Sequence, residues 1–284
     1  MELRKLKYWI FIPILIAAVS CEEEVKDGVL PEFKQKLVVS SFISPSDTVS
    51  YITVSSNRRI YGELGIVETL GNLSGYVSDD TKEIQLVRTA TGFKFRHEDL
   101  QITEGKTYHI KVISDKGLTA EASCTVPISR RLELKVDTFT IIQTDPWGYL
   151  GNRFMAKVII TDYPGEKNFY RLYCEQDIYY RTDNLSWKIP YNGFENEFFS
   201  DYGNDGKTIE STSLDLYNSP EDSVIFKCYI LNTSQGYYNY HTSINNYSGG
   251  DDPFTEVSPV YSNIKGGLGI FAAYTIDSLI YRLN

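Results

Sequence analysis

The stretch KLVVSSFIS (36–44), followed by the turn PSD (45–47) and by VSYITVSSN (49–57), decides the fold class. Apolar and polar residues alternate with a period of two in both runs, and proline, serine and aspartate separate them. Because successive side chains of a strand point to opposite faces, this alternation predicts two half-buried β-strands joined by a turn.

The same alternation recurs as far as Pro127, with a turn after about every dozen residues. The runs that carry it are GYVSD (75–79), KEIQLVRT (82–89), GFKFRHE (92–98), LQITEGKTYHIKVIS (100–114) and LTAEASCTVP (118–127). These short strands predict an immunoglobulin-like or fibronectin-like β-sandwich over residues 35–128. Pro127 marks its end, because proline cannot donate to a central β-ladder.

Residues 129–284 have longer alternating runs, which predict a second, antiparallel β-rich domain, either a sandwich or a partly open barrel. The runs are LELKVDTFTIIQT (132–144), RFMAKVIITD (153–162), NFYRLYCEQDIYYRT (168–182), SVIFKCYILN (223–232) and GGLGIFAAYTID (266–277). The chain has no internal repeat that would suggest another architecture.

One segment, SQGYYNYHTSINNYS (234–248), breaks the alternation. Ser234 is a suitable N-cap. The residues that recur at helical spacing are Tyr237, Tyr240, His241 and Ile244. This spacing predicts one short amphipathic helix laid against the C-terminal sheet.

The first 20 residues have the features of a secretory signal peptide. Arg4, Lys5 and Lys7 precede an apolar run from Tyr8 to Val19, which is shorter than the ~20 residues that span a bilayer. The tetrapeptide AVSC (18–21) resembles a bacterial lipobox, in which the cysteine is lipidated and becomes the first residue. We expect lipidation at Cys21, and outer-membrane lipid as a partner through it. The alternative is an ordinary cleaved signal with an incidental cysteine.

An acidic tether over residues 21–34 follows the cysteine. Glu22, Glu23 and Glu24 resemble the export signal of surface-displayed lipoproteins of the Bacteroidota. This resemblance implies a lipid-anchored outer-membrane protein that faces the extracellular medium. The alternative is a solvated linker that happens to be acidic, since charged linkers extend by self-repulsion.

Net charge limits the classes of partner. The chain carries −9, and removal of residues 1–20 takes away three basic residues and one acidic residue, which leaves −11. Nucleic acids and anionic membrane surfaces attract basic proteins, so we expect no nucleic-acid partner. The 22 tyrosines and 14 phenylalanines suit a β-rich protein, where aromatic rings pack on pleated surfaces.

Motifs of catalysis and of metal binding are missing from the sequence. His97, His109 and His241 lie far apart, and the sequence contains no HExxH, P-loop or GxSxG motif. We therefore expect no enzymatic activity, no catalytic residue and no cofactor. The segment DYGNDGKTIE (201–210) resembles the start of a calcium loop, but Thr212 stands where an EF-hand needs a bidentate carboxylate. An Asp-Gly hairpin turn explains it better, so we also expect no metal.

Three cysteines follow Cys21, at positions 124, 174 and 228. An odd number cannot all pair within one chain. Each lies in a strand-like alternation, which indicates buried thiols. A bridge between Cys174 and Cys228 is the open alternative.

Aromatic clusters in polar surroundings mark the expected binding surface. WGYLGNRF (147–154) and YYRTDNLSWKIPYNGF (179–194) contain Trp147, Trp187 and Tyr191 in predicted loops. Loops on a rigid scaffold commonly carry recognition, and tryptophan and tyrosine are common anchors. We expect contacts there with a partner or with a glycan or peptide ligand. The alternative is that these rings pack in the core.

Three segments resemble a Bacteroidota lipoprotein family known only as a domain of unknown function. They are KLVVSSFISPSDTVSYITVS (36–55), NFYRLY (168–173) and DPFTEVSPVYSNIKGGLGIFAAYTID (252–277). The resemblance implies a non-enzymatic accessory subunit of a TonB-dependent, Sus-like nutrient-uptake system, with a transporter barrel as partner. The competing hypothesis is a self-standing surface protein for ligand binding or adhesion.

The glycines of the last of these segments have two interpretations. Gly266, Gly267 and Gly269 permit a sharp backbone path into the final strand. They either let a loop approach a partner or form a tight corner that fixes the helix to the sheet.

Overall fold

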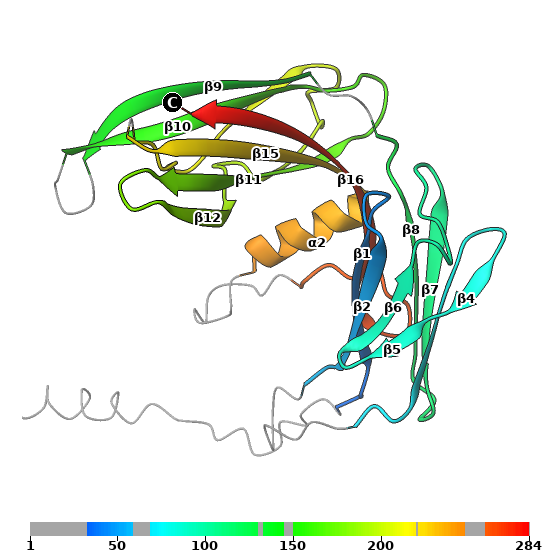
Figure 1. Ribbon diagram of the computed structural model, residues 1–284. Coiled ribbons are helices and arrows are strands. Elements are labelled where there is room, and N and C mark those ends of the chain that lie inside the picture. Colours follow the sequence, from blue (N-terminus) through cyan, green and yellow to red (C-terminus); the bar gives the residue numbers. More distant parts are fainter. Residues whose placement is uncertain are drawn as a thin grey trace, which may run out of the picture. The chain divides into compact units, whose positions relative to one another are not determined.

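The computed structural model describes residues 33–58, 69–129, 133–144, 150–219, 221–247 and 259–283. Within these ranges the chain is mostly β, with several antiparallel sheets, one helix and no sheet that closes into a barrel (Figure 1). The sequence prediction of a mostly β protein with a short helix is therefore confirmed.

The N-terminal strands form two sheets around one hydrophobic core. One sheet has the order β4-β3-β7-β8, and the other contains β1, β2, β6 and β5 in that order. Their bounds are β1 Leu37–Ile43, β2 Val49–Ser56, β3 Leu73–Ser78, β4 Glu83–Gln85, β5 Val87–Thr89, β6 Gly92–Arg96, β7 Thr107–Ser114 and β8 Thr119–Thr125. Leu37 and Ile52 from one sheet share the core with Val77 and Val112 from the other, as in the predicted sandwich.

The C-terminal half repeats this arrangement with longer strands. A sheet of order β14-β10-β9 shares a second core with β12, β11 and β15, which continue in that order to β16, and β13 pairs with β11. The bounds are β9 Glu133–Thr144, β10 Leu150–Thr161, β11 Phe169–Tyr180, β12 Leu185–Asn192, β13 Phe198–Ser200, β14 Thr208–Thr212, β15 Ser223–Thr233 and β16 Leu268–Leu283.

Strand β16 belongs to both halves. Its residues from Leu268 to Ala273 pair in parallel with β1, and those from Tyr274 to Leu283 pair antiparallel with β15. Figure 1 shows β16, in red, continuing from the side of β1 to the side of β15. The chain after Pro127 therefore contributes a strand to the sheet that starts with residues 36–44.

The path of β16 past β1 depends on glycine. Gly269 faces Val39 across the parallel pair and has a φ of 110°, in the region that only glycine enters without strain. A Cβ on Gly269 would lie 2.0 Å from the Val39 carbonyl oxygen. The two backbones approach too closely for any side chain there.

The predicted helix is present as α2 (Gln235–Asn245). Ser234 caps it, and the Ser234 hydroxyl accepts a hydrogen bond from the Tyr237 N–H. The predicted face is only partly correct, because Tyr237 is buried whereas 42% of Ile244 is exposed. Among the described residues, no helix has the length and apolar character needed to cross a membrane.

Asn263 and Ser234, on the two sides of the helix–strand corner, both bond to the backbone of β16. Asn263 donates to the Phe271 carbonyl (2.7 Å) and accepts from the Phe271 N–H (2.9 Å). The Ser234 N–H donates to the Ala273 carbonyl over 2.9 Å. This geometry supports the interpretation that the glycine-rich segment forms a tight corner fixing the helix to the sheet.

The described cysteines are buried thiols. Cys174 and Cys228 are Cα partners in neighbouring strands, yet no disulfide joins them. Burial raises the pKa of the Cys228 thiol to about 12, which keeps it protonated.

We predict that Gly269→Ala lowers the free energy of unfolding by at least about 3 kcal/mol, because it adds a steric clash to backbone strain. Gly203→Ala is the matched control. Gly203 also has a positive φ (77°), but a Cβ there meets no atom within 4 Å. The control should cost about 1–2 kcal/mol. Urea unfolding of the full chain in detergent measures both, and equal losses would contradict the structural role of Gly269.

Candidate functional site

One face of the C-terminal sheet presents charged and aromatic side chains. From Phe169 to Ile178 half-buried and buried residues alternate along β11, so every second side chain points away from the core. We use the name open face for six half-buried residues of β11 and β15. They are Arg171, Tyr173, Glu175 and Asp177 on β11, with Lys227 and Tyr229 on β15.

The rings and charges of the open face are paired with one another. Tyr173 and Tyr229 stack with their centroids 4.9 Å apart. Lys188 of β12 lies 2.9 Å from the Glu175 carboxylate, and Lys227 forms an ion pair with Asp177. These pairs hold the side chains in defined positions and leave little net charge on this part of the surface.

Helix α2 lies against one end of the open face and encloses a cavity of about 350 Å³, which we call the aromatic pocket. Its lining residues are Phe42, Arg171, Tyr173, Leu231, Tyr237, His241 and Tyr274. They come from β1, β11, β15, α2 and β16. The volume falls in the range of small-ligand sites, about 300–1,000 Å³.

Arg171 is the charged centre of the pocket. Its Nε–H donates to Glu197 over 2.7 Å, and its Nη1 donates to the Tyr237 hydroxyl over 2.6 Å. Its guanidinium also lies 5.1 Å from the centroid of the Phe198 ring. Burial alone would lower the pKa of Arg171, but Tyr237 and Glu197 raise it above its usual value. A guanidinium carries five N–H donors in one plane, so Arg171 gives the pocket directional hydrogen-bond donors as well as a positive charge.

His241 is a neutral ring within an aromatic cluster. It stacks on Phe42 and on Phe198, with centroids 5.3 Å and 5.5 Å away. Burial, reinforced by the nearby Arg171, lowers the pKa of His241 to about 4. Its buried Nε2 has no hydrogen-bond partner among the described residues. The pocket therefore combines a permanent cation, a neutral imidazole and several ring faces.

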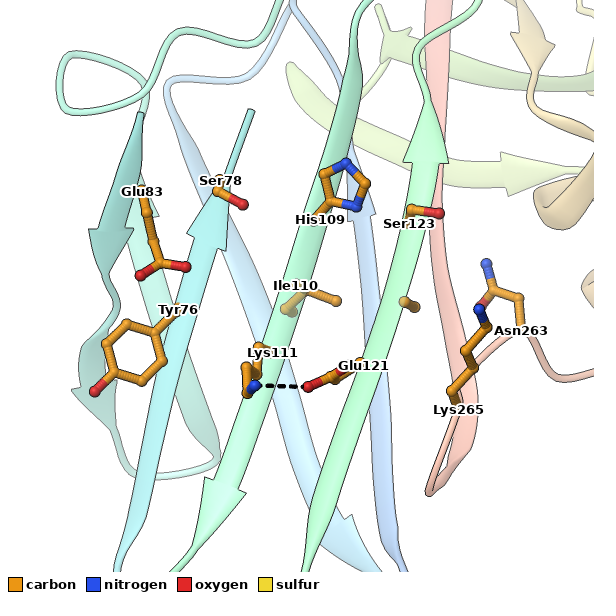
Figure 2. Close-up of a pocket in the computed structure, with 11 residues that line it drawn as sticks. Tyr76, Ser78, Glu83, His109, Ile110, Lys111, Glu121, Ser123, Asn263 and Lys265 are labelled. Carbon is orange, nitrogen blue, oxygen red and sulfur yellow. Dashed lines mark ion pairs between the residues drawn. The ribbon is translucent and has the colours of Figure 1, made fainter. Parts of the chain in front are cut away.

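A second cavity, of about 400 Å³, lies on the outer face of the sandwich (Figure 2). Figure 2 shows Tyr76, His109, Lys111 and Glu121 on neighbouring strands, with the ion pair between Lys111 and Glu121 (2.8 Å) drawn as a dashed line. About half of the Lys111 and Glu121 side chains is exposed, at 48% and 49%. This cavity has the character of a solvated sheet face, so the aromatic pocket is the better candidate.

One acidic cluster could hold a metal ion. Carboxylate oxygens of Asp162, Asp201 and Asp205 all lie within 4.8 Å of one another. No other cluster of histidine, cysteine or acidic side chains with metal-ligand geometry occurs among the described residues.

Among the sequence-predicted site residues, the structure describes Trp187 and the backbone of Tyr191. Cys21, Glu22, Glu23, Glu24 and Trp147 lie outside the described residues. Trp187 and Tyr191 do not lie in a loop, as predicted, but in the edge strand β12, and the prediction is wrong on this point. The alternation of apolar residues in LSWKIPYN is the signal for that strand.

Trp187 lies on the opposite face from the aromatic pocket. It is directly across from Ile178, which belongs to the core, so both side chains point to the core side of the sheet. At the sheet edge Trp187 is 64% exposed. It is an exposed aromatic ring, as expected, but not part of the pocket.

Sequence reasoning missed Arg171, Tyr173, Phe42 and Tyr274 as site residues. They occur in the three segments that carry the family resemblance, 36–55, 168–173 and 252–277. The structure brings these segments to one pocket. The outward positions of the alternating runs were the signal that could have identified them.

Comparisons with known proteins give one broad match. A family model described as "Domain of unknown function (DUF4249)" matches residues 22–280. No curated protein matches the chain. Among solved structures, "Biofilm associated protein - B domain" is similar over 86% of this chain and 85% of that chain, with 6% identity and a TM-score of 0.21. At that TM-score the similarity does not establish a shared fold.

The buried neutral state of His241 predicts a pH dependence of stability. In the unfolded chain the His241 pKa is near 6.5, and in the folded chain it is about 4. The unfolded state therefore binds more protons as the pH falls from about 6.5 to 4, and stability is lost in that window. Because the ring is partly exposed, we expect a contribution of about 1–2 kcal/mol after screening.

We predict that His241→Phe reduces the loss of unfolding free energy between pH 6.5 and pH 4 by about 1–2 kcal/mol. The matched control is His109→Phe, at an exposed histidine of β7. Denaturant unfolding at several pH values measures the slopes. The same slope for the wild type and His241→Phe would show that the ring does not stay neutral.

Proposed function

We propose, for a chain that belongs to the DUF4249 family, a non-enzymatic binding function carried by the aromatic pocket at a bacterial cell surface. The observation that carries this proposal is the composition of the pocket. A guanidinium and several ring faces surround one cavity. Such a set binds a flat or apolar group that bears oxygen acceptors.

A glycan or a peptide has the chemistry that this pocket fits. Aromatic rings stack on apolar faces, and Arg171 can donate to hydroxyl, carbonyl or carboxylate oxygens. Burial and Arg171 keep the pKa of His241 low, so the ring stays neutral near pH 7 and adds no positive charge. The paired charges of the open face could continue the contact along β11 and β15.

The proposal also includes a location, which is the outer membrane. Cys21 would carry the lipid anchor, with Glu22, Glu23 and Glu24 directing the protein to the outer face of the outer membrane. The resemblance to Bacteroidota lipoproteins supports an accessory subunit of a TonB-dependent nutrient-uptake system. A self-standing binding or adhesion lipoprotein is the second candidate, favoured if no transporter accompanies the chain.

We predict that Cys21→Ser leaves the chain unlipidated and moves it from the membrane fraction to the soluble fraction, because a cleaved chain without acyl groups has no anchor. Fractionation followed by immunoblotting measures this. Cys124→Ser is the matched control, since Cys124 is a buried residue of β8. Retention of a signal-cleaved Cys21→Ser chain in the membrane would refute the anchor.

A pull-down of the tagged full chain in detergent tests the transporter. Co-purification of one TonB-dependent transporter, identified by mass spectrometry, is the expected result. A clean monomer would instead favour the self-standing protein.

Replacing Glu22, Glu23 and Glu24 by alanine tests the export signal. Unchanged sensitivity to external protease would show that these residues are only a linker.

We predict that Tyr173→Ala weakens ligand binding at least tenfold, about 1.4 kcal/mol, because it removes a ring that lines the pocket. Binding of oligosaccharides and short peptides from two panels is measured by the change in intrinsic fluorescence of the protein. These titrations identify the ligand class and give the affinities. Trp187→Ala is the matched control on the other face of the sheet. If Trp187→Ala abolishes binding and Tyr173→Ala does not, the site lies on β12.

A further inference from the structure

Three aspartates from two loops meet beside the start of β11. Asp162 directly follows β10, whereas Asp201 and Asp205 lie in the loop between β13 and β14. Their carboxylate oxygens lie within 4.8 Å of one another. Asp162 and Asp201 are 3% and 6% exposed, so two of the three charges are buried.

Neutral groups donate hydrogen bonds to these carboxylates. The Tyr170 hydroxyl donates to Asp162 Oδ1 (2.5 Å), and the Gly206 N–H donates to Asp162 Oδ2 (2.9 Å). The N–H groups of Asn168 and Gly165 donate to Asp201 Oδ2 (2.8 Å) and Asp205 Oδ1 (2.7 Å).

No basic side chain forms an ion pair with this cluster among the described residues. Lys207 lies in the same loop, but its Nζ donates to the Gly203 carbonyl over 2.8 Å. Burying carboxylates together without a counter-charge is unfavourable, because each charge loses hydration and repels the others. A bound cation would offset this repulsion.

Asn168 provides an independent observation. It is 5% exposed, and its buried Oδ1 has no hydrogen-bond partner among the described residues. Its backbone N–H bonds to the Asp201 carboxylate. Asn168 lies directly before β11, and the alternation of burial continues through it, since Asn168 and Tyr170 are buried and Phe169 between them is half-buried. This alternation puts the Asn168 side chain on the same side as that of Tyr170, whose hydroxyl reaches Asp162. An amide oxygen on that side is a further ligand for a cation.

We propose that Asp162, Asp201 and Asp205, together with the side-chain oxygen of Asn168, bind one calcium ion. Calcium takes oxygen ligands at 2.3–2.6 Å, so two ligands on opposite sides of the ion lie about 4.6–5.2 Å apart. The separations in the cluster fit that span. An all-oxygen ligand set disfavours zinc and copper, which prefer nitrogen and sulfur.

This site differs from an EF-hand in the origin of its carboxylates. In DYGNDGKTIE (201–210), Asp201 and Asp205 occupy the first and fifth positions of a calcium loop, and Thr212 stands at the twelfth. Asp162, at the end of β10, supplies a third carboxylate from elsewhere in the chain. The missing twelfth-position ligand therefore does not exclude calcium.

The ion would connect the β10–β11 loop to the β13–β14 loop. Strand β11 begins at Phe169, directly after Asn168, and carries Arg171 and Tyr173 into the aromatic pocket. The calcium site would thus fix the start of the strand that positions the pocket.

Calcium titration of the full chain in detergent tests the proposal. The protein is stripped with EDTA, and CaCl2 is added while heat release and melting temperature are recorded. We expect one ion per chain and a rise in melting temperature of about 5–10 °C at a concentration about 100-fold above the dissociation constant. MgCl2 at the same concentration should give a smaller rise, because magnesium requires a stricter octahedral geometry.

Asp205→Asn is the decisive variant, because Asp205 is exposed and its replacement should not prevent folding. It should keep the melting temperature of the EDTA-treated wild type and lose most of the calcium-dependent rise. Asp183→Asn, at an exposed aspartate in the β11–β12 turn, is the matched control and should retain the rise. No calcium-dependent rise in the wild type, or an equal rise in Asp205→Asn, would overturn the proposal.

Discussion

The backbone hydrogen bonds of β16 are the interaction on which the rest of the structure depends. The first part of the strand completes the sheet of β1, and its second part closes the edge of β15. The backbone N–H and C=O groups of a strand need hydrogen-bond partners on neighbouring strands. For β16 these neighbours come from both halves of the protein. Gly269 permits the close approach to β1, and the bonds from Asn263 and Ser234 fix the chain at the same point.

Much of the fold could be predicted because its signal is local. The alternation in KLVVSSFIS and NFYRLYCEQDIYYRT marks strands directly, and Ser234 marks the start of the helix. The parallel pairing of residues 268–273 with β1 could not be predicted, since nothing in an alternating run specifies a distant partner. A different limit affected LSWKIPYN (185–192), where turn-forming neighbours obscured a strand that the structure places at a sheet edge.

The candidate site shows a different limit. Aromatic residues in polar surroundings indicated Trp187 correctly as an exposed ring, but the sequence did not show which face of the sheet it occupies. Arg171 and Tyr173 take the outward positions of a strand whose alternate residues are buried. Their place in a pocket depends on α2, β1 and β16, which converge there only in the folded chain. The acidic cluster has the same origin, because Asp162 reaches Asp201 and Asp205 across two loops.

A strand that joins the two halves of one nine-stranded sheet also governs how the chain can fold. Neither β1 nor β15 has all its ladder bonds until residues 268–283 have docked, and the partner segments are distant in sequence. Closing such long loops costs entropy before any long-range contact compensates for it, so formation of this topology is slow. The two halves are therefore coupled, since unravelling β16 removes hydrogen bonds from both at once. We expect one concerted loss of structure on heating rather than two separate domain transitions.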